Sequence, residues 1–535
     1  MSKTNRKQTF LGGAAVLAVA TALVKVIGAI YKIPLNRLLG TKGFGYFNTA
    51  YDIYAVLLMV SMTGLPVAMS RMISEARALG RTRQIRQIYR VSLVVFLIIG
   101  LAGAGGMAIL CKQLAALMSQ KESWFAILCL SPAVLFICLV SADRGYFQGQ
   151  SNMVPTSVSQ ILEALCKLVI GLAAAWFFKK QTGSMVYAAG GAILGVTVGT
   201  LVAMLYTTFK RRRAMAELDA ESCGDETVLP RKATAKQLLG IAIPITLGAA
   251  GMQLIIAVDA AVYMARLKGA AGFASAQADE MKGIYNFCQT IFNMPCAFIT
   301  PLTVSVIPAI TEQLTRRANR SAKTVAESAI RVTSLIAMPC SIGLIVLAEP
   351  IMALLGGYAG AQLALAAKLM RILGACVFIN SLVLIVTAIL QAHNFVYLPV
   401  LNLAIGGIVK VIVNFVLVGN RSINIVGAPL GTLICYLLIS SLDVFALRRV
   451  LRNPPAVLRN LYRSAIAALV MGAAAFGVDR LLSAAGFGAA IRAAGSILAA
   501  VVVYAVMVLI MKVITADDCK LLPKGDKIAK ILKIS

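Results

Sequence analysis

The feature that most constrains the fold is a succession of apolar runs, each about twenty residues long, separated by charged loops. A helix of about twenty residues crosses a hydrocarbon core about 30 Å thick and satisfies its own backbone hydrogen bonds there. Only 13% of the residues are charged and the mean hydropathy is +0.85, whereas soluble domains carry about 25% charged residues. The sequence therefore predicts an all-α integral membrane protein.

We predict about fourteen transmembrane helices, whose ends are placed only to within several residues. The first apolar run follows Lys3, Arg6 and Lys7 and continues past Lys25. It is too long for the apolar part of a cleaved signal peptide, so we interpret it as a first helix that stays in the protein. The fourteen windows are 10–33, 44–69, 90–111, 123–142, 155–178, 185–208, 237–264, 284–311, 328–348, 366–390, 397–418, 425–446, 462–481 and 488–512.

The net charge of +30 comes from Lys and Arg residues that lie mainly between the apolar runs. In that position they set topology, and nucleic acid is not expected as a partner. With the N-terminus inside, the cytoplasmic segments hold most of the 51 Lys and Arg residues. An even number of helices places the basic tail from Lys520 to Lys533 inside as well. We therefore predict the cytoplasmic membrane, with both termini in the cytoplasm.

Two segments of the first half of the chain resemble two segments of the second half, and both pairs are separated by a similar number of residues. This indicates an internal repeat. Lys42-Gly43 opens a segment that resembles the one opened by Lys282-Gly283. Gln148, Pro155 and Lys167 correspond to Gln391, Pro399 and Lys410, and the spacing from Gln to Lys is nineteen residues in both (148 to 167 and 391 to 410). Six helices in each half would give two pseudo-symmetric lobes that run the same way through the membrane, followed by two additional helices.

The predicted domains follow from this repeat and from the charged segment after the sixth window. They are an N-lobe at 1–208, a cytoplasmic charged linker at 209–236, a C-lobe at 237–448, and a region at 449–535 with two helices and a basic cytoplasmic tail.

Ionisable residues inside the predicted spans are candidates for a substrate site, because burying a charge in a bilayer is costly. Lys25 lies about eight residues from the outer end of the first helix, roughly 12 Å deep at 1.5 Å per residue, so we expect it to line a cavity. Lys32 is near that end, where it can line the cavity or extend to the interface. Glu163 and Lys167 are four residues apart, which places them on one helix face within reach of an ion pair. They can form a purely structural ion pair or be part of the substrate site.

The second half contributes three further candidates. Lys410 is the repeat equivalent of Lys167, and Asn414 lies one helical turn beyond it. Asp259 is an intramembrane carboxylate that fits either a cation or proton site or a salt bridge to a lysine of the other half. With Lys368 and Arg371 included, the intramembrane set is mainly cationic, which suits an anionic headgroup such as a pyrophosphate.

The sequence offers no sign of a metal or cofactor site. The eleven cysteines form no Cys-x-x-Cys pair and there is a single histidine, His393. Paired aspartates or His/Glu sets of a membrane-embedded enzyme are likewise not found, so an enzyme is not expected.

Three segments resemble the stage V sporulation protein B group, in the polysaccharide-exporter branch of the MOP superfamily, which includes MurJ-like lipid II flippases. They are LVKVIGAIYKIPLNRLLGTKGFGYFNTAYDIY (23–54), RGYFQGQSNMVPTSVSQILEALCKLVIGL (144–172) and IAIPITLGAAGMQLIIAVDAAV (241–262). The resemblance implies a MurJ-like fold. It also implies that the chain flips an undecaprenyl-pyrophosphate-linked oligosaccharide, lipid II or a related peptidoglycan or polysaccharide precursor, from the inner to the outer leaflet by alternating access.

The cationic residues that line the central cleft of MurJ are matched only in part by this sequence. Lys25 stands where MurJ has the first of two arginines on its first helix, and Tyr31, next to Lys32, stands at the second. Leu57 and Leu58 occupy the region where MurJ has an arginine on its second helix. The alternative function is a MATE-type exporter of drugs or organic cations coupled to Na⁺ or H⁺, which would depend on an intramembrane carboxylate such as Asp259.

Overall fold

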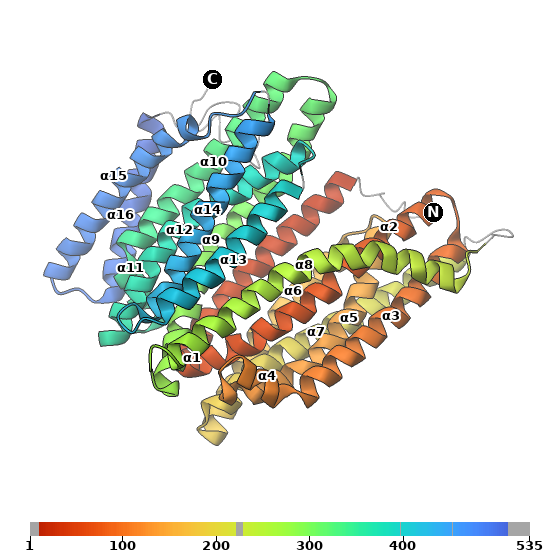
Figure 1. The fold of residues 1–535 in the computed structure, drawn as a ribbon, viewed down its shortest axis with the longest axis horizontal. Coiled ribbons are helices and arrows are strands. Elements are labelled where there is room, and N and C mark those ends of the chain that lie inside the picture. Colours follow the sequence, from red (N-terminus) through yellow and green to blue (C-terminus); the bar gives the residue numbers. More distant parts are fainter. Residues whose placement is uncertain (1–9, 221–227, 396, 452, 512–535) are drawn as a thin grey trace, which may run out of the picture. The chain divides into compact units, whose positions relative to one another are not determined.

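The computed structural model describes residues 10–220, 228–395, 397–451 and 453–511, and within these ranges the chain forms helices and no strand (Figure 1). The predicted basic ends, with Lys3, Arg6, Lys7 and Lys520 to Lys533, lie outside the described residues, as does the acidic part of the linker at 221–227. The described residues of all fourteen predicted apolar windows lie almost entirely on helices; the first window lies on α1, and the second begins on α1 and continues into α2.

The helices of the first half are α1 (Phe10–Met62), α2 (Gly64–Ala78), α3 (Thr82–Ile109), α4 (Cys111–Leu117), η1 (Lys121–Ser123), α5 (Trp124–Gly149), α6 (Val154–Thr182), α7 (Met185–Ala220) and α8 (Arg231–Lys268). Those of the second half are α9 (Ser275–Thr315), α10 (Asn319–Val346), α11 (Ala348–Ile351), η2 (Met352–Gly356), α12 (Gly360–Ala392), α13 (Tyr397–Val418), η3 (Asn424–Val426), α14 (Gly427–Val450), α15 (Val457–Ala484) and α16 (Ala489–Ile510).

Eleven helices in the described part of the chain are long and apolar enough to cross a membrane. The first of them, Leu23–Arg77, covers parts of two predicted windows. The windows at 237–264 and 284–311 lie on α8 and α9, which are not among the eleven.

The first two predicted helices are joined within α1 by a break at Gly40. Its backbone angles, φ 64° and ψ 179°, are not helical, and Pro34 lies six residues (40 − 34) earlier in the chain. Glycine adopts positive φ without steric cost, whereas a residue with a Cβ atom pays for it. The chain can therefore change direction at Gly40 without an intervening loop.

The chain divides by its contacts into two compact units. The first holds Met1–Ala265 with Ser275–Gly283, and the second holds Arg266–Ala274 with Ile284–Ser535. By these contacts α8 belongs to the first unit as far as Ala265. The predicted lobe boundary at 209–236 remains a prediction.

Each unit packs its helices in the same order. In the first, α5 lies between α3 and α7, and α7 packs on α6. In the second, α12 lies between α10 and α14, and α14 packs on α13, while α15 covers α10 and pairs with α16. The repeated residues occupy equivalent places, because Gln148 and Gln391 each precede the last residue of their helix, α5 and α12, while Lys167 and Lys410 lie within α6 and α13. The predicted pseudo-symmetric helical fold is therefore confirmed.

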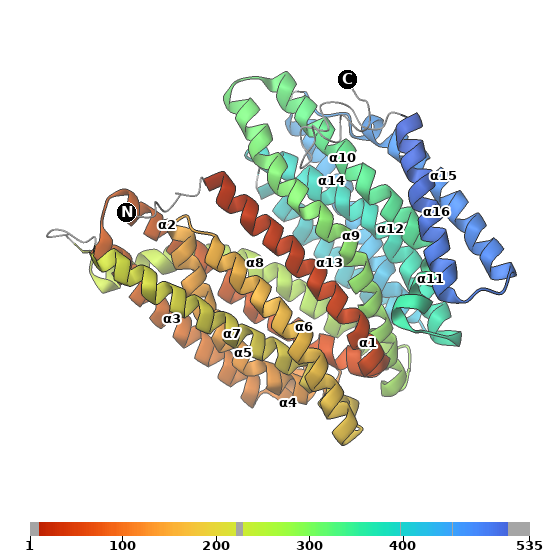
Figure 2. The ribbon, with the colours of Figure 1, turned by 180° about the vertical axis from the view of Figure 1, so that it is seen from behind.

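Small residues allow α6 and α7 to approach closely, and Figure 2 shows the two helices side by side from behind. Gly191, Gly195 and Gly199 recur every four residues on α7 and face α6, where Gly195 lies against Gly171. In membranes such small-residue rows bring helix backbones together, and the association is driven by packing.

Gly195→Ala is expected to destabilise the protein by about 1–3 kcal/mol, because the new methyl group would overlap backbone atoms of Gly171. Gly105→Ala, on α3, is the matched control, since a methyl group there meets no atom within 4 Å. Thermal unfolding of both purified variants in detergent checks this. Equal melting temperatures would contradict the close approach of α6 and α7.

Candidate functional site

A cavity of about 190 Å³ lies within the first unit, lined by residues of α1, α5, α6 and α7. Three of the predicted site residues line it together: Lys25 from α1, and Glu163 and Lys167 from α6. Arg144 from α5 joins them, as do Tyr51 and Tyr54, Gln160 and several apolar side chains. The described lining residues thus include three cationic side chains and one carboxylate, in a region made of candidate transmembrane segments.

Lys167 is positioned by aromatic rings. Its ammonium lies 4.5 Å from the ring centre of Tyr51 and 5.4 Å from that of Tyr31. Tyr31 is fully buried, and its hydroxyl donates a hydrogen bond to the carbonyl oxygen of Ala192 on α7 at 3.1 Å. Cation–π attraction stabilises the ammonium without using its N–H donors. Among the described residues Lys167 makes no hydrogen bond, so these donors are available to a ligand in the cavity.

Glu163 forms its ion pair with Arg144 and not with Lys167. The Arg144 guanidinium lies 3.3 Å from the Glu163 carboxylate, and its Nε donates to the Ser159 hydroxyl at 2.9 Å. Arg144 is only 3% exposed. The i,i+4 spacing correctly placed Glu163 and Lys167 on one surface, but packing of α5 on α6 brings a stronger partner to the carboxylate. Arg144 is not among the predicted site residues because the fourth predicted window ends at residue 142, although Arg144 opens the RGYFQG segment.

Arg144→Met is expected to destabilise the protein by about 2–3 kcal/mol, less than the 3–5 kcal/mol of a fully buried pair because the Glu163 side chain is 25% exposed. The loss arises from a carboxylate left without its partner, so the double variant Arg144→Met/Glu163→Gln should recover most of it. A double-mutant cycle on thermal stability measures the coupling. Strictly additive effects would show that the two side chains do not interact.

The other predicted residues of the first unit lie outside this cavity lining. The ammonium of Lys32 is half-buried and donates to the Asn48 side-chain oxygen at 3.5 Å, a long contact. Asp259 is buried on α8, with 4% of its surface exposed. Neither residue is among the described residues that line the cavity, although Lys32 lies close enough to Lys167 for their charges to repel.

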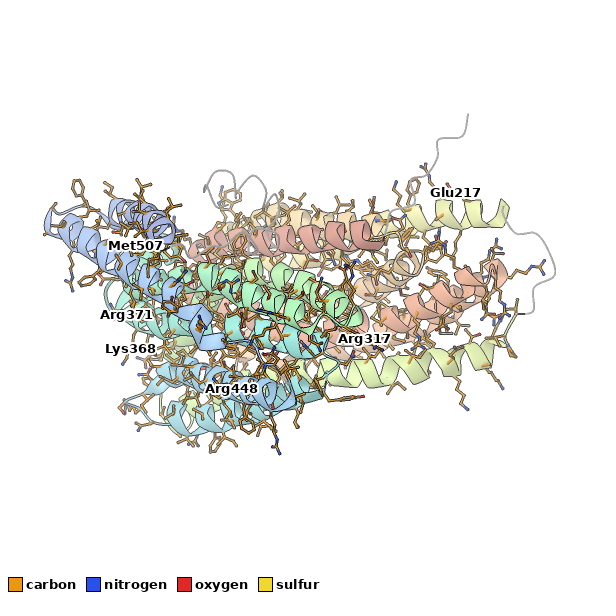
Figure 3. The ribbon with its side chains drawn as sticks, turned by 90° about the horizontal axis from the view of Figure 1, so that it is seen from above. Glu217, Arg317, Lys368, Arg371, Arg448 and Met507 are labelled. Carbon is orange, nitrogen blue, oxygen red and sulfur yellow. The ribbon has the colours of Figure 1, made fainter. Side chains whose placement is uncertain are left out.

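In the second unit, Lys410 is half-buried on α13 and Asn414 is fully buried on the same helix. The Asn414 side chain packs against Gly431 of α14, where a Cβ atom would overlap its amide oxygen. Lys368 and Arg371, which we had counted with the intramembrane cations, are exposed on α12 (Figure 3). They lie one turn apart near the beginning of that helix, so their charges need no buried partner.

A further carboxylate, not identified from the sequence, links three helices of the second unit. Asp443 on α14 is fully buried and accepts hydrogen bonds from Asn402 at 2.7 Å and Thr387 at 3.0 Å. Thr387 and Asn402 follow Arg144 and Ser159 by 243 positions (387 − 144 and 402 − 159), which is also the offset from Lys167 to Lys410 (410 − 167). Equivalent positions of the two halves thus both join neighbouring helices through polar side chains. In the first half the link includes an arginine–glutamate ion pair, and in the second half it consists of hydrogen bonds to an aspartate.

Comparison with known protein families and relatives identifies what this chain is similar to. The model of a family described as polysaccharide biosynthesis protein matches residues 10–314, and the MatE model matches residues 279–416. Stage V sporulation protein B of Bacillus subtilis (strain 168) is 26% identical, over 97% of this chain and 98% of its own length. Lipid II flippase MurJ of the same organism is 24% identical, over 80% of each chain.

Solved structures show the same fold. The inward closed conformation of lipid II flippase MurJ matches with a TM-score of 0.67 at 14% identity, covering 93% of this chain and 98% of that one. An inward-facing multidrug resistance MATE family transporter of the MOP superfamily matches with a TM-score of 0.65 at 14% identity, covering 81% and 98%. The predicted resemblance and fold class are therefore confirmed. The chain is a multi-pass membrane protein that belongs to the polysaccharide biosynthesis protein family.

Proposed function

We propose that the protein is a flippase that moves an undecaprenyl-pyrophosphate-linked oligosaccharide, lipid II or a related precursor, from the inner to the outer leaflet. The observation that carries the proposal is the cavity of the first unit, where, among the described lining residues, Lys25, Arg144 and Lys167 are accompanied by one carboxylate, Glu163. Its excess of positive charge suits a pyrophosphate, which guanidinium and ammonium groups bind through charge-assisted hydrogen bonds. Relatives described as a flippase and as transporters support transport, and no catalytic step is proposed.

The proposed mechanism is alternating access, with the headgroup bound between leaflets and the polyprenyl chain left in lipid. We propose that Lys32, Asp259, Lys410 and Asn414 complete the substrate pathway, with Lys410 as the second unit's equivalent of Lys167. Both termini lie in the cytoplasm in this scheme. Outward movement of negative charge is driven by an inside-negative membrane potential, at about 2.3 kcal/mol per charge per 100 mV, with Na⁺ or H⁺ as the alternative coupling ion.

The proposal is tested by expressing this chain in cells depleted of their own lipid II flippases. The precursor should then reach the outer leaflet, where an added enzyme or label that cannot cross the membrane modifies it. A chain that is inserted in the membrane but leaves the precursor inaccessible would overturn the proposal for lipid II.

A second candidate function is favoured by the MatE match at 279–416: a MATE-type exporter of cations coupled to an ion. Such an exporter would depend on Asp259 more than on Lys25. The flippase proposal expects Lys25→Ala to lower flipping about tenfold, whereas Asp259→Asn should have the smaller effect on it. Export of a fluorescent organic cation that is lost in Asp259→Asn and kept in Lys25→Ala would favour the exporter instead.

A further inference from the structure

A buried carboxylate of the second unit, Asp443 on α14, has no positively charged partner in the described part of the chain. It is fully buried, and its two oxygens accept hydrogen bonds from neutral groups, the Asn402 amide at 2.7 Å and the Thr387 hydroxyl at 3.0 Å. The three residues lie on α14, α13 and α12, all of which are candidate membrane spans. An ionised carboxylate in such a place is costly, because neutral donors replace only part of its lost hydration.

Two other buried carboxylates show how this protein compensates such a charge. Asp143 on α5 forms an ion pair with Arg211 at 2.7 Å, and Asp479 on α15 forms one with Arg492 at 3.0 Å. Asp443 is more deeply buried than either of these acids. Exposure to solvent therefore does not compensate its charge, and a positively charged species is needed to neutralise it.

The internal repeat places this acid in the second unit alone. At the offset of 243 residues, Thr387 corresponds to Arg144 and Asp443 corresponds to Thr200 on α7 (387 − 144 and 443 − 200). Thr200 is buried and uncharged, and its hydroxyl donates to the Thr197 carbonyl oxygen at 2.9 Å. The first unit thus has an arginine where the second has a threonine, and no acid where the second has Asp443.

A proton is the cation that this arrangement accommodates. In the ionised state the Thr387 hydroxyl and the Asn402 amide both donate to the Asp443 carboxylate. When a proton binds to the oxygen that faces Thr387, the new O–H donates to the Thr387 hydroxyl oxygen, since a hydroxyl both donates and accepts. The threonine hydrogen then turns to a backbone carbonyl of the preceding helical turn, as it commonly does in helices. Asn402 keeps its hydrogen bond, so both protonation states have hydrogen-bond partners.

A metal ion fits this place less well than a proton. Hard cations take about six or more oxygen ligands, whereas Asn402 and Thr387 direct N–H and O–H groups at the carboxylate. The described residues also include no group of three or more His, Cys, Asp or Glu side chains that could hold a metal.

The other ionisable groups on the helices around Asp443 form no ion pair or hydrogen bond with it, as far as the described residues show. Those that are at least partly buried are Cys376 on α12, His393 just beyond it, Lys410 on α13, and Cys435 and Tyr436 on α14. The exposed ones are Lys368 and Arg371 near the beginning of α12, Tyr397 on α13, Arg448 and Arg449 on α14, and Glu312 at the end of α9 (Figure 3). Protonation of Asp443 therefore changes the charge of a single group.

We propose that Asp443 is a proton-binding site of the second unit, held by Asn402 and Thr387 in both protonation states. While buried as in this structure, the carboxyl group carries the proton, and it releases the proton when transport brings Asp443 into contact with water. Proton uptake from outside and release into the cytoplasm then couple flipping to the proton gradient. This coupling rests on the proposed function, whereas proton binding does not.

Proton binding is tested by infrared spectroscopy of the purified full-length protein, which separates the C=O stretching band of a protonated carboxyl group from carboxylate bands. Asp443→Asn removes the acid and keeps its shape. Glu312→Gln is the matched control, because it removes an exposed carboxylate of the second unit that is paired with Arg316 at 2.7 Å. Thermal melting of both variants establishes that they are folded.

At neutral pH the wild type and the control should show a protonated-carboxyl band that is absent from Asp443→Asn and that disappears on alkaline titration. An unchanged spectrum of the folded Asp443→Asn variant would overturn the proposal. Loss of the band when Na⁺ is added at constant pH would assign the site to a metal ion and overturn it as well.

The coupling is tested in liposomes that hold the protein in one orientation, with the membrane potential held at zero. A gradient of about one pH unit, acid outside, should enrich the precursor in the outer leaflet by up to about tenfold for one coupled proton. The enrichment should be absent from Asp443→Asn and present in Glu312→Gln. A wild type that flips the precursor without responding to the gradient would overturn the coupling. A wild type that flips none would overturn the proposed function and leave the infrared result unchanged.

Discussion

Replacing Lys167 by methionine is expected to lower flipping of the pyrophosphate-linked precursor by about 30-fold, with normal expression and membrane insertion. Tyr31 and Tyr51 hold the ammonium in the cavity without engaging its N–H donors. A hydrogen bond between a charged group and its partner contributes about 1.5–3 kcal/mol, and each 1.4 kcal/mol corresponds to a factor of ten. The rate at which precursor becomes accessible at the outer surface measures the effect.

Lys180 provides the matched control for this variant. It lies on the same helix, and its ammonium stacks on Trp176 at 5.2 Å, but it is exposed and does not line the cavity. Lys180→Met should therefore leave flipping within about twofold of wild type, and Lys167→Arg should retain part of it, because the positive charge stays in place. Equal rates for Lys167→Met and Lys180→Met would contradict a role for the cavity charge.

Gly283→Ala is expected to cost at least about 3 kcal/mol of stability. The beginning of α9 lies directly on the chain before Gly43, so a methyl group at Gly283 would overlap the Thr41 carbonyl oxygen. Next to it the fully buried Lys282 donates to the Thr49 hydroxyl at 2.6 Å, and that hydroxyl in turn donates to Gln120. Since backbone atoms must move apart, these hydrogen bonds should weaken together.

Thermal melting in detergent checks this prediction, with Gly343→Ala on α10 as the control. That position is also helical, and a methyl group there meets no atom within 4 Å. The control should melt at the wild-type temperature or slightly above it, because alanine favours a helix more than glycine does. A Gly283→Ala variant as stable as the control would show that α9 does not pack against Thr41 at Gly283.

The helices and their repeat could be predicted from the sequence because the bilayer imposes a simple requirement. Each span needs about twenty apolar residues, so the windows stand out regardless of which helices become neighbours. Lys25, Glu163 and Lys167 could be selected for a related reason, since an ionisable residue within an apolar run is costly unless it faces a polar cavity. The repeat offset between Lys167 and Lys410 likewise follows from sequence spacing alone.

The ion pairs and hydrogen bonds between side chains of different helices could not be predicted, because they depend on how the helices pack. Arg144 reaches Glu163 only through the contact of α5 with α6, and Asp443 reaches Thr387 and Asn402 only when three helices meet. The aromatic support of Lys167 requires Tyr31 and Tyr51 to approach from α1, a helix broken at Gly40. A sequence pattern identifies residues that need partners but does not say which helix supplies them.

The central claim is that buried positive charge in the first unit recognises an anionic lipid headgroup, and direct binding tests it most closely. The affinity of the purified wild type and of Lys25→Met/Lys167→Met is measured in one detergent for a polyprenyl pyrophosphate and for the uncharged polyprenol. We predict that the wild type prefers the pyrophosphate at least about tenfold and that the double variant binds both lipids alike. A wild type that does not distinguish the two lipids, or a folded double variant that keeps the full preference, would contradict the claim.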